Sequence, residues 1–173
     1  AAELEAAAPT DKTISVDAVT ALPVGTWGDG AGFGVGALGR FEMPLTGKLT
    51  LTGRLGFVYH LGKDAPAGPG GGAGASSNAL EIPLFGGVRY PLSGRPGAEI
   101  YGAAELGLVY YRVSSEYMGM SQSGSNTNLG MTLGAGYRAG KLDVRGGLLC
   151  PDLGHVGDAI GVMATVGYEV SVL

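Results

Sequence analysis

The stretch AIGVMATVGYEVSVL, residues 159–173, decides the fold. Its even positions form an unbroken apolar row: Ile160, Val162, Ala164, Val166, Tyr168, Val170 and Val172. Its odd positions carry small or polar residues: Ala159, Gly161, Met163, Thr165, Gly167, Glu169 and Ser171. Because successive side chains of a strand point to opposite faces, this segment predicts a β-strand with one apolar and one small or polar face.

The same division recurs along the chain, and the charges collect on the face that carries the glycines. In residues 31–43, Phe33 and Val35 point one way, whereas Arg40 and Glu42 share the other face with three glycines. A soluble barrel of lipocalin type would put its large apolar row inside and its charges outside, so it is disfavoured. A closed barrel in lipid, apolar outside and polar inside, accounts for the pattern. We therefore predict an all-β fold, an eight-stranded antiparallel up-and-down transmembrane β-barrel.

Composition agrees with a membrane barrel. Charged residues make up 15% of the chain, below the roughly 25% of soluble domains, and mean hydropathy is +0.23. No apolar run approaches the ~18 residues of a spanning helix. The net charge of −4 argues against a nucleic-acid partner, and the single Cys150 cannot form an internal disulfide.

Eight segments show the alternation, each near the ~9–11 residues that a tilted strand needs to cross a bilayer. They are Lys12–Leu22, Ala31–Met43, Lys48–His60, Ala79–Tyr90, Ala98–Val113, Asn128–Arg138, Lys141–Cys150 and Ala159–Leu173. Mostly long polar loops are expected after every odd-numbered strand, including Pro23–Gly30, Leu61–Asn78 and Ser114–Thr127. Tight turns are expected after the even-numbered strands, including Pro91–Gly97. Residues 1–11 form an expected mobile tail, and 12–173 a single barrel domain.

Over residues 12–173 this pattern resembles the small eight-stranded outer-membrane barrels, the group of outer membrane proteins A, W and X and the neisserial surface protein. The resemblance implies a bacterial outer membrane with both termini in the periplasm and the long loops outside. Membrane lipid is then one partner. We expect a second, an extracellular partner or surface polymer, at residues 61–78 and 114–127. We expect a monomer without cofactors.

Charged residues on the predicted inner face would meet inside a narrow barrel, whose interior is just wide enough to be filled by side chains. We expect a salt-bridge network among Arg40, Arg54, Glu81, Arg89, Glu105 and Arg145. Counting from the tight turns puts Arg54, Glu81 and Glu105 near mid-height on consecutive strands. Such a network would hold the barrel shut, although a switchable gate stays open as an alternative. The inward glycines of residues 31–43, 128–138 and 159–173 are expected to leave room for water.

Two further groups could carry chemistry. Asp152, His155 and Asp158 could bind zinc, nickel or manganese, since imidazole and carboxylates suit these ions, or they could simply form a turn. His60, at the end of its strand, could act as the acid/base partner of a serine in a lipid hydrolase. Trp27 and Tyr111 are expected in an aromatic girdle at the outer rim.

Three functions follow from these patterns. The first is a structural or surface-interaction protein that acts through its outer loops and has a charge-plugged lumen. The second is a narrow channel or transporter for small solutes, including hydrophobic ones. The third is an outer-membrane lipid-modifying enzyme, although we do not expect the protein to be an enzyme.

Overall fold

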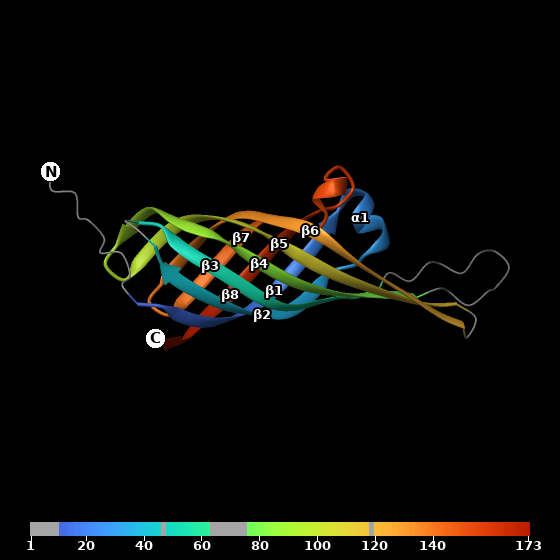
Figure 1. Ribbon diagram of the computed structural model, residues 1–173, viewed down its shortest axis with the longest axis horizontal. Coiled ribbons are helices and arrows are strands. Elements are labelled where there is room, and N and C mark those ends of the chain that lie inside the picture. The colour runs from blue at the N-terminus through green and yellow to red at the C-terminus, as the bar shows by residue number, and fades with distance from the viewer. Residues whose placement is uncertain (1–10, 46–47, 63–75, 118–119) are drawn as a thin grey trace.

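The computed structural model describes residues 11–45, 48–62, 76–117 and 120–173. These residues form eight strands: β1 (Thr13–Val24), β2 (Gly34–Pro44), β3 (Thr50–His60), β4 (Ser76–Arg95), β5 (Ala98–Tyr117), β6 (Met120–Ala139), β7 (Leu142–Cys150) and β8 (Ile160–Val172). Each strand pairs antiparallel with its neighbour in the chain, and β1 pairs with β8 to close the barrel (Figure 1). The predicted fold is confirmed. In the described ranges no helix is long and apolar enough to span a membrane.

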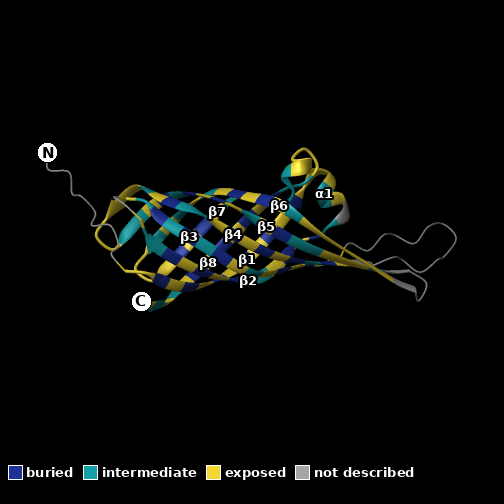
Figure 2. Ribbon diagram, in the orientation of Figure 1, coloured by how far each residue is buried: buried dark blue, intermediate teal, exposed yellow. Residues whose placement is uncertain are grey.

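Side chains alternate between the lumen and the outside, as the chequered ribbon of Figure 2 shows. Leu106 and Val166 are each 52% exposed on the outer surface, whereas Arg54 and Glu105 are each 2% exposed in the lumen. Large apolar residues that face outward while charges face inward are the pattern of a barrel in lipid. The predicted orientation of the two faces is confirmed.

The barrel has two distinct ends. At the terminal end, Thr13 pairs with Val172, and the short connections 45–49, 96–97 and 140–141 lie there. At the opposite end, which we call the loop end, lie α1 (Gly25–Gly30), the short helix η1 (Leu153–His155) and the extensions of β4, β5 and β6 (Figure 1). The predicted long connections are present after β1, β3 and β7, but not after β5, which ends at Tyr117 only three residues before β6 begins at Met120.

The predicted loop Ser114–Thr127 is wrong, because its described residues, 114–117 and 120–127, belong to β5 and β6. The two strands stay paired from Val113 opposite Gly124 to Tyr117 opposite Met120, and β4 joins them from Ser76 onward. We call residues 76–78, 113–117 and 120–125 the tongue, which extends beyond the rest of the barrel (Figure 1). Ser, Asn and Gly suggest a loop in isolation, but a backbone ladder with neighbouring strands overrides that propensity.

Other predicted boundaries of strands and loops also differ from those in the structure. The predicted turn Pro91–Gly97 is mostly strand, because β4 runs to Arg95 after a register shift between Pro91 and Ser93, and the chain turns at Gly97, whose φ is 82°. The predicted loop Pro23–Gly30 contains the end of β1 and the helix α1. Of the predicted loop Leu61–Asn78, residues 76–78 belong to β4, and residues 63–75 lie outside the described part, as do residues 1–10 of the tail.

An interruption lies where a proline falls within a strand. The pairing of β3 with β4 stops after Leu55 opposite Leu84 and resumes at Val58 opposite Glu81 in the same register. Pro83 lies in this gap and has no N–H to donate to β3, while its other side still pairs with Val109 of β5.

Candidate functional site

The terminal half of the lumen holds a cluster of charged side chains, which we call the terminal cluster. Its members are Asp17, Arg40, Glu42, Arg89, Glu99, Arg138 and Asp143. Arg40 bridges two strands, with Nη2 3.2 Å from Asp17 Oδ1 and Nη1 3.1 Å from Asp143 Oδ1. Four carboxylates and three guanidinium groups thus meet in one layer, and they come from β1, β2, β4, β5, β6 and β7.

Tyr101 ties this cluster to the barrel wall. Its hydroxyl donates a hydrogen bond of 2.6 Å to Asp143, and the Arg89 guanidinium lies 4.9 Å from the centre of its ring. Arg89 also pairs with Glu42 at 3.3 Å, and Arg138 pairs with both Glu42 and Asp143. Buried charges need such partners because an unpaired one costs several kcal/mol. Two of the six predicted network residues, Arg40 and Arg89, therefore lie in this layer.

A second group, the middle cluster, is centred on one carboxylate. Glu105 accepts two parallel hydrogen bonds of 3.0 Å from Arg145 and pairs with Arg54. The hydroxyls of Thr132 and Thr52 donate to the same carboxylate at 2.7 and 3.0 Å. Two guanidinium groups thus share one carboxylate, and the predicted residues Arg54, Glu105 and Arg145 are brought together.

Glu81 does not join Arg54 and Glu105, contrary to our expectation. The register places it opposite Val58 of β3 and Tyr111 of β5, and its Oε2 lies 3.0 Å from Nε2 of His60. The predicted height of Glu81 in the barrel was counted from a turn that begins at Pro91, but β4 continues to Arg95. Glu81 therefore lies nearer the loop end than the count implied.

An apolar layer fills the lumen between the middle cluster and the loop end. It consists of Val19, Ala21, Leu38, Val58, Phe85, Val109, Leu149 and Met163, all buried. Trp27 and Tyr111 pack against it. Sequence analysis missed this layer, because no strand contributes more than two of its residues and alternation alone does not give their heights.

The loop end of the lumen carries the mouth cluster, which comprises Trp27, His60, Glu81 and Tyr111. The His60 ring lies 5.5 Å from the Trp27 ring and stacks on Tyr111 at 5.9 Å. Nδ1 of His60 lies 3.1 Å from the Gly32 carbonyl, which can only accept, so Nδ1 carries a proton and donates. On the other side of the ring, Nε2 lies 3.0 Å from Glu81 Oε2 and 3.3 Å from the Tyr111 hydroxyl. Trp27 and Tyr111 thus line the mouth and do not belong to a rim girdle.

Neighbouring side chains occupy the space beside several inward glycines, which corrects the expectation that these glycines leave room for water. A Cβ on Gly136 would lie 2.3 Å from the Tyr101 ring, and one on Gly161 would lie 2.6 Å from Trp27. The same holds for Gly34 against His60 and for Gly167 against Asp17. Glycine is required where another side chain lies this close to the backbone. The sequence shows the glycines but not the partners that occupy their space.

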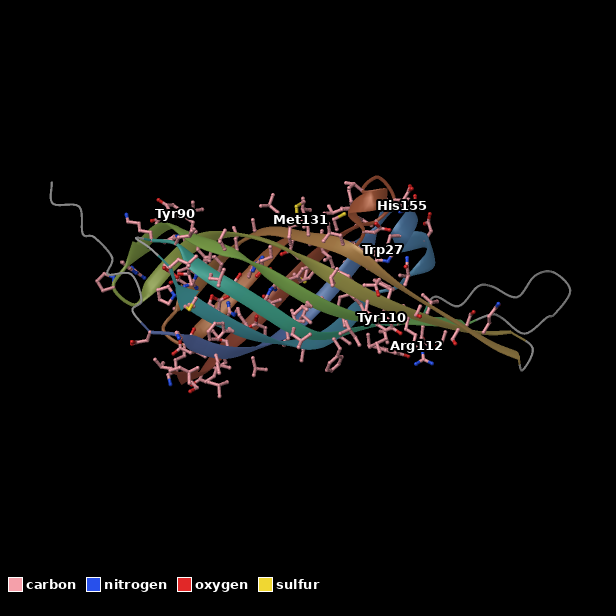
Figure 3. All side chains as sticks on the ribbon, in the orientation of Figure 1. Trp27, Tyr90, Tyr110, Arg112, Met131 and His155 are labelled. Atoms are coloured by element: carbon pink, nitrogen blue, oxygen red, sulfur yellow. The ribbon has the colours of Figure 1, made fainter. Side chains whose placement is uncertain are left out.

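A cavity of about 390 Å³ opens above the mouth cluster, and we call it the mouth pocket. Its walls include Trp27, His60, Tyr111, Asn78, Asn128 and Asp152. Figure 3 shows Trp27 at the loop end, near the connection that carries His155. The backbone N–H of Trp27 donates to the Asp158 carbonyl at 2.9 Å, which fastens α1 to that connection. Pockets of this size in barrel mouths are typical small-molecule sites.

The candidate metal ligands are arranged as a turn. Asp152 Oδ1 accepts from the Gly154 N–H at 2.8 Å, and Oδ2 lies 2.9 Å from Nδ1 of His155. The hydrogen bond with His155 lowers the pKa of Asp152. Asp158 contacts His155 through its backbone N–H. Within the part of the chain that the structure describes, no group of three His, Cys, Asp or Glu side chains is placed to hold a metal ion.

Comparison with solved structures shows that the chain has the fold of small eight-stranded outer-membrane barrels. Ail of Yersinia pestis superposes with a TM-score of 0.61 at 14% identity, covering 92% of this chain and 97% of that one. Neisserial surface protein A gives 0.56 at 15% identity, covering 92% and 96%. The N-terminal barrel domain of Pseudomonas aeruginosa OprF gives 0.55 at 14%, covering 91% and 97%. No protein-family model and no curated protein sequence matches the chain.

Proposed function

We propose that the protein lies in a bacterial outer membrane with its terminal end in the periplasm and its loop end outside. There it acts as a surface-interaction protein whose lumen is closed to bulk solutes. The observation that carries this proposal is the tongue, a paired three-stranded extension that leaves the barrel at one end only. Three fold neighbours support the location: the attachment invasion locus protein Ail of Yersinia pestis, neisserial surface protein A and the N-terminal β-barrel domain of Pseudomonas aeruginosa OprF.

The side chains that fill the lumen support the proposal that it is closed to bulk solutes. The terminal cluster, the middle cluster and the apolar layer follow one another between the two ends, and their members are mostly buried. A solute would have to break buried ion pairs, and each charge left unpaired costs several kcal/mol. Planar-bilayer recordings of the refolded protein are therefore expected to lack discrete conductance steps. Regular steps in the wild type would favour the channel hypothesis.

The chemistry of the tongue favours a polar partner. Its described side chains, including Ser114, Gln122 and Ser125, are exposed and mostly uncharged, so this extension is suited to water. Ail has been crystallised with the heparin analogue sucrose octasulfate. Among the described residues at the surface of the loop end, Arg112 is a cation, whereas Asp29, Asp152 and Asp158 each carry a carboxylate. That balance favours an uncharged surface polymer over a sulfated one.

Shortening the tongue tests the proposal. Replacing residues 114–123 by Asn-Gly, a two-residue hairpin turn, is expected to abolish binding of protein-bearing vesicles or cells to target-cell surfaces. A matched change at the terminal end, Gly140→Asn with Lys141→Gly, should leave binding intact. Equal binding by the wild type and the shortened protein would contradict the proposal.

Binding is also better supported than lipid hydrolysis. Both ring nitrogens of His60 already face partners, Gly32 on one side and Glu81 on the other. A general base needs a free nitrogen within hydrogen-bond reach of its nucleophile. We therefore expect no change in lipid products when His60 is replaced by Gln. Loss of a lipid-cleaving activity in that variant would favour the enzyme hypothesis.

A further inference from the structure

We propose that the mouth pocket binds one uncharged sugar unit of a surface glycan. This inference rests on the proposed function, since it requires the loop end to face the exterior. It goes further by naming the ligand class and the side chains that would recognise it.

Size and aromatic lining point to a sugar ring. The cavity of about 390 Å³ lies within the range of small-ligand pockets and accommodates a single ring with its substituents. Trp27 and Tyr111 line it, with their ring planes at 72° to each other. The C–H face of a pyranose packs against such π-faces, because the electron-rich face attracts the weakly positive hydrogens. Both rings line the same cavity, so one sugar ring can contact both.

Side-chain amides supply the polar part of the recognition. Oδ1 of Asn128 accepts a hydrogen bond of 2.8 Å from Asn126, while its Nδ2 donates to no described residue. Asn78 accepts from the Gly62 N–H through Oδ1 at 3.2 Å, which fixes the amide plane and turns its NH₂ group away from that bond. Amide N–H groups are suitable donors to sugar hydroxyl oxygens.

The site is preorganised, which lowers the entropic cost of binding. His60 is held at both ring nitrogens, and Trp27 is held by its backbone bond to Asp158. Gly161 provides the space in which the indole lies. The aromatic faces are therefore in position before a ligand arrives.

The lining selects against two other ligands. No lysine or arginine lines the pocket among the described residues, and the Asp152 carboxylate does, so a sulfate or phosphate group would be repelled. An alkyl chain would cover Asn128 and leave its amide N–H groups without hydrogen-bond partners, which opposes binding. An uncharged, hydroxyl-rich ring satisfies both conditions.

Trp27, the single tryptophan of the chain, reports on the site directly. The full-length protein, refolded in detergent micelles, would be titrated with methyl glycosides of glucose, galactose, mannose and N-acetylglucosamine while tryptophan emission is recorded. At least one sugar should give a saturable emission change and protect Trp27 from acrylamide quenching. Asn128→Ala should weaken that binding about tenfold, the effect of one lost hydrogen bond. Ser93→Ala, at the terminal end, should leave it unchanged.

The outcomes separate this inference from the proposed function. No saturation with any of the four sugars, or saturation with sucrose octasulfate in their place, would overturn the sugar site. An unchanged affinity in Asn128→Ala would do the same. If shortening the tongue abolishes cell-surface binding but no sugar changes Trp27 emission, the surface role stands and the pocket inference fails. If a sugar binds in the pocket but cell-surface binding survives the shortening of the tongue, the pocket inference stands and the proposed role of the tongue fails.

Discussion

At the scale of single residues, Glu105 is the carboxylate on which the middle cluster depends. It neutralises part of the charge of both Arg54 and Arg145, and all three are buried. Glu105→Gln would leave two guanidinium groups without a counter-charge. We expect this change to lower the free energy of unfolding by about 3–5 kcal/mol, the usual cost of breaking a buried pair. Urea unfolding in lipid vesicles, followed by tryptophan emission, measures it.

Arg145→Met provides the matched comparison. It removes one of the two cations and leaves Arg54 paired with Glu105 in a balanced pair. Because a methionine of similar length fills the space and no charge is stranded, the loss should be well below that of Glu105→Gln. Equal losses in the two variants would show that charge balance does not govern this layer.

Gly136 shows how much of the lumen depends on a missing side chain. A Cβ there would meet the Tyr101 ring, which holds Asp143 in place through its hydroxyl. We expect Gly136→Ala to destabilise the barrel by about 1–3 kcal/mol, the cost of overpacking a filled interior. In contrast, Gly146→Ala places its Cβ where nothing lies within 4 Å, so it should be close to neutral. Urea midpoints of the two variants decide the matter, and a neutral Gly136→Ala would contradict the packing described.

At the scale of elements, the alternation predicted each strand of the barrel but not the tongue. Within the membrane, lipid and lumen impose opposite polarities on the two faces, so the sequence must alternate. Beyond it, the described side chains of the tongue on both faces, those of residues 113–115 and 122–125, are open to water, and the constraint disappears. These residues read as a loop because only their backbone pairing, which carries no side-chain signature, keeps them extended.

The tongue should therefore be separable from the barrel. Its described side chains bury no apolar layer, whereas the barrel strands line the lumen on one side and face lipid on the other. Replacing residues 114–123 by Asn-Gly is expected to leave the urea midpoint within experimental error of the wild type. The heat-dependent gel shift of the folded barrel should also persist. A large fall in either would mean that the tongue holds β4, β5 and β6 together.

At the scale of the whole molecule, the two faces of the wall could be predicted, but the grouping of lumen residues could not. Polarity along each strand distinguishes lumen from lipid without reference to any other strand. Which charges meet depends on register, and an error of a few residues at Pro91–Gly97 was enough to place Glu81 beside Arg54 instead of His60. The mouth cluster also needs α1, whose six residues carry no periodic signal.

Lipid contact of the outer apolar rows is the claim on which every other statement depends. Spin labels at Leu106 and Val166, introduced through cysteine in a Cys150→Ser background, would test it in lipid vesicles, with a label at Ser123 of the tongue as the water-exposed control. The account predicts that both wall labels are relaxed by dissolved oxygen and shielded from a water-soluble nickel complex, while Ser123 shows the opposite. Wall labels as accessible to the nickel complex as the control would contradict a barrel that turns its apolar rows toward lipid.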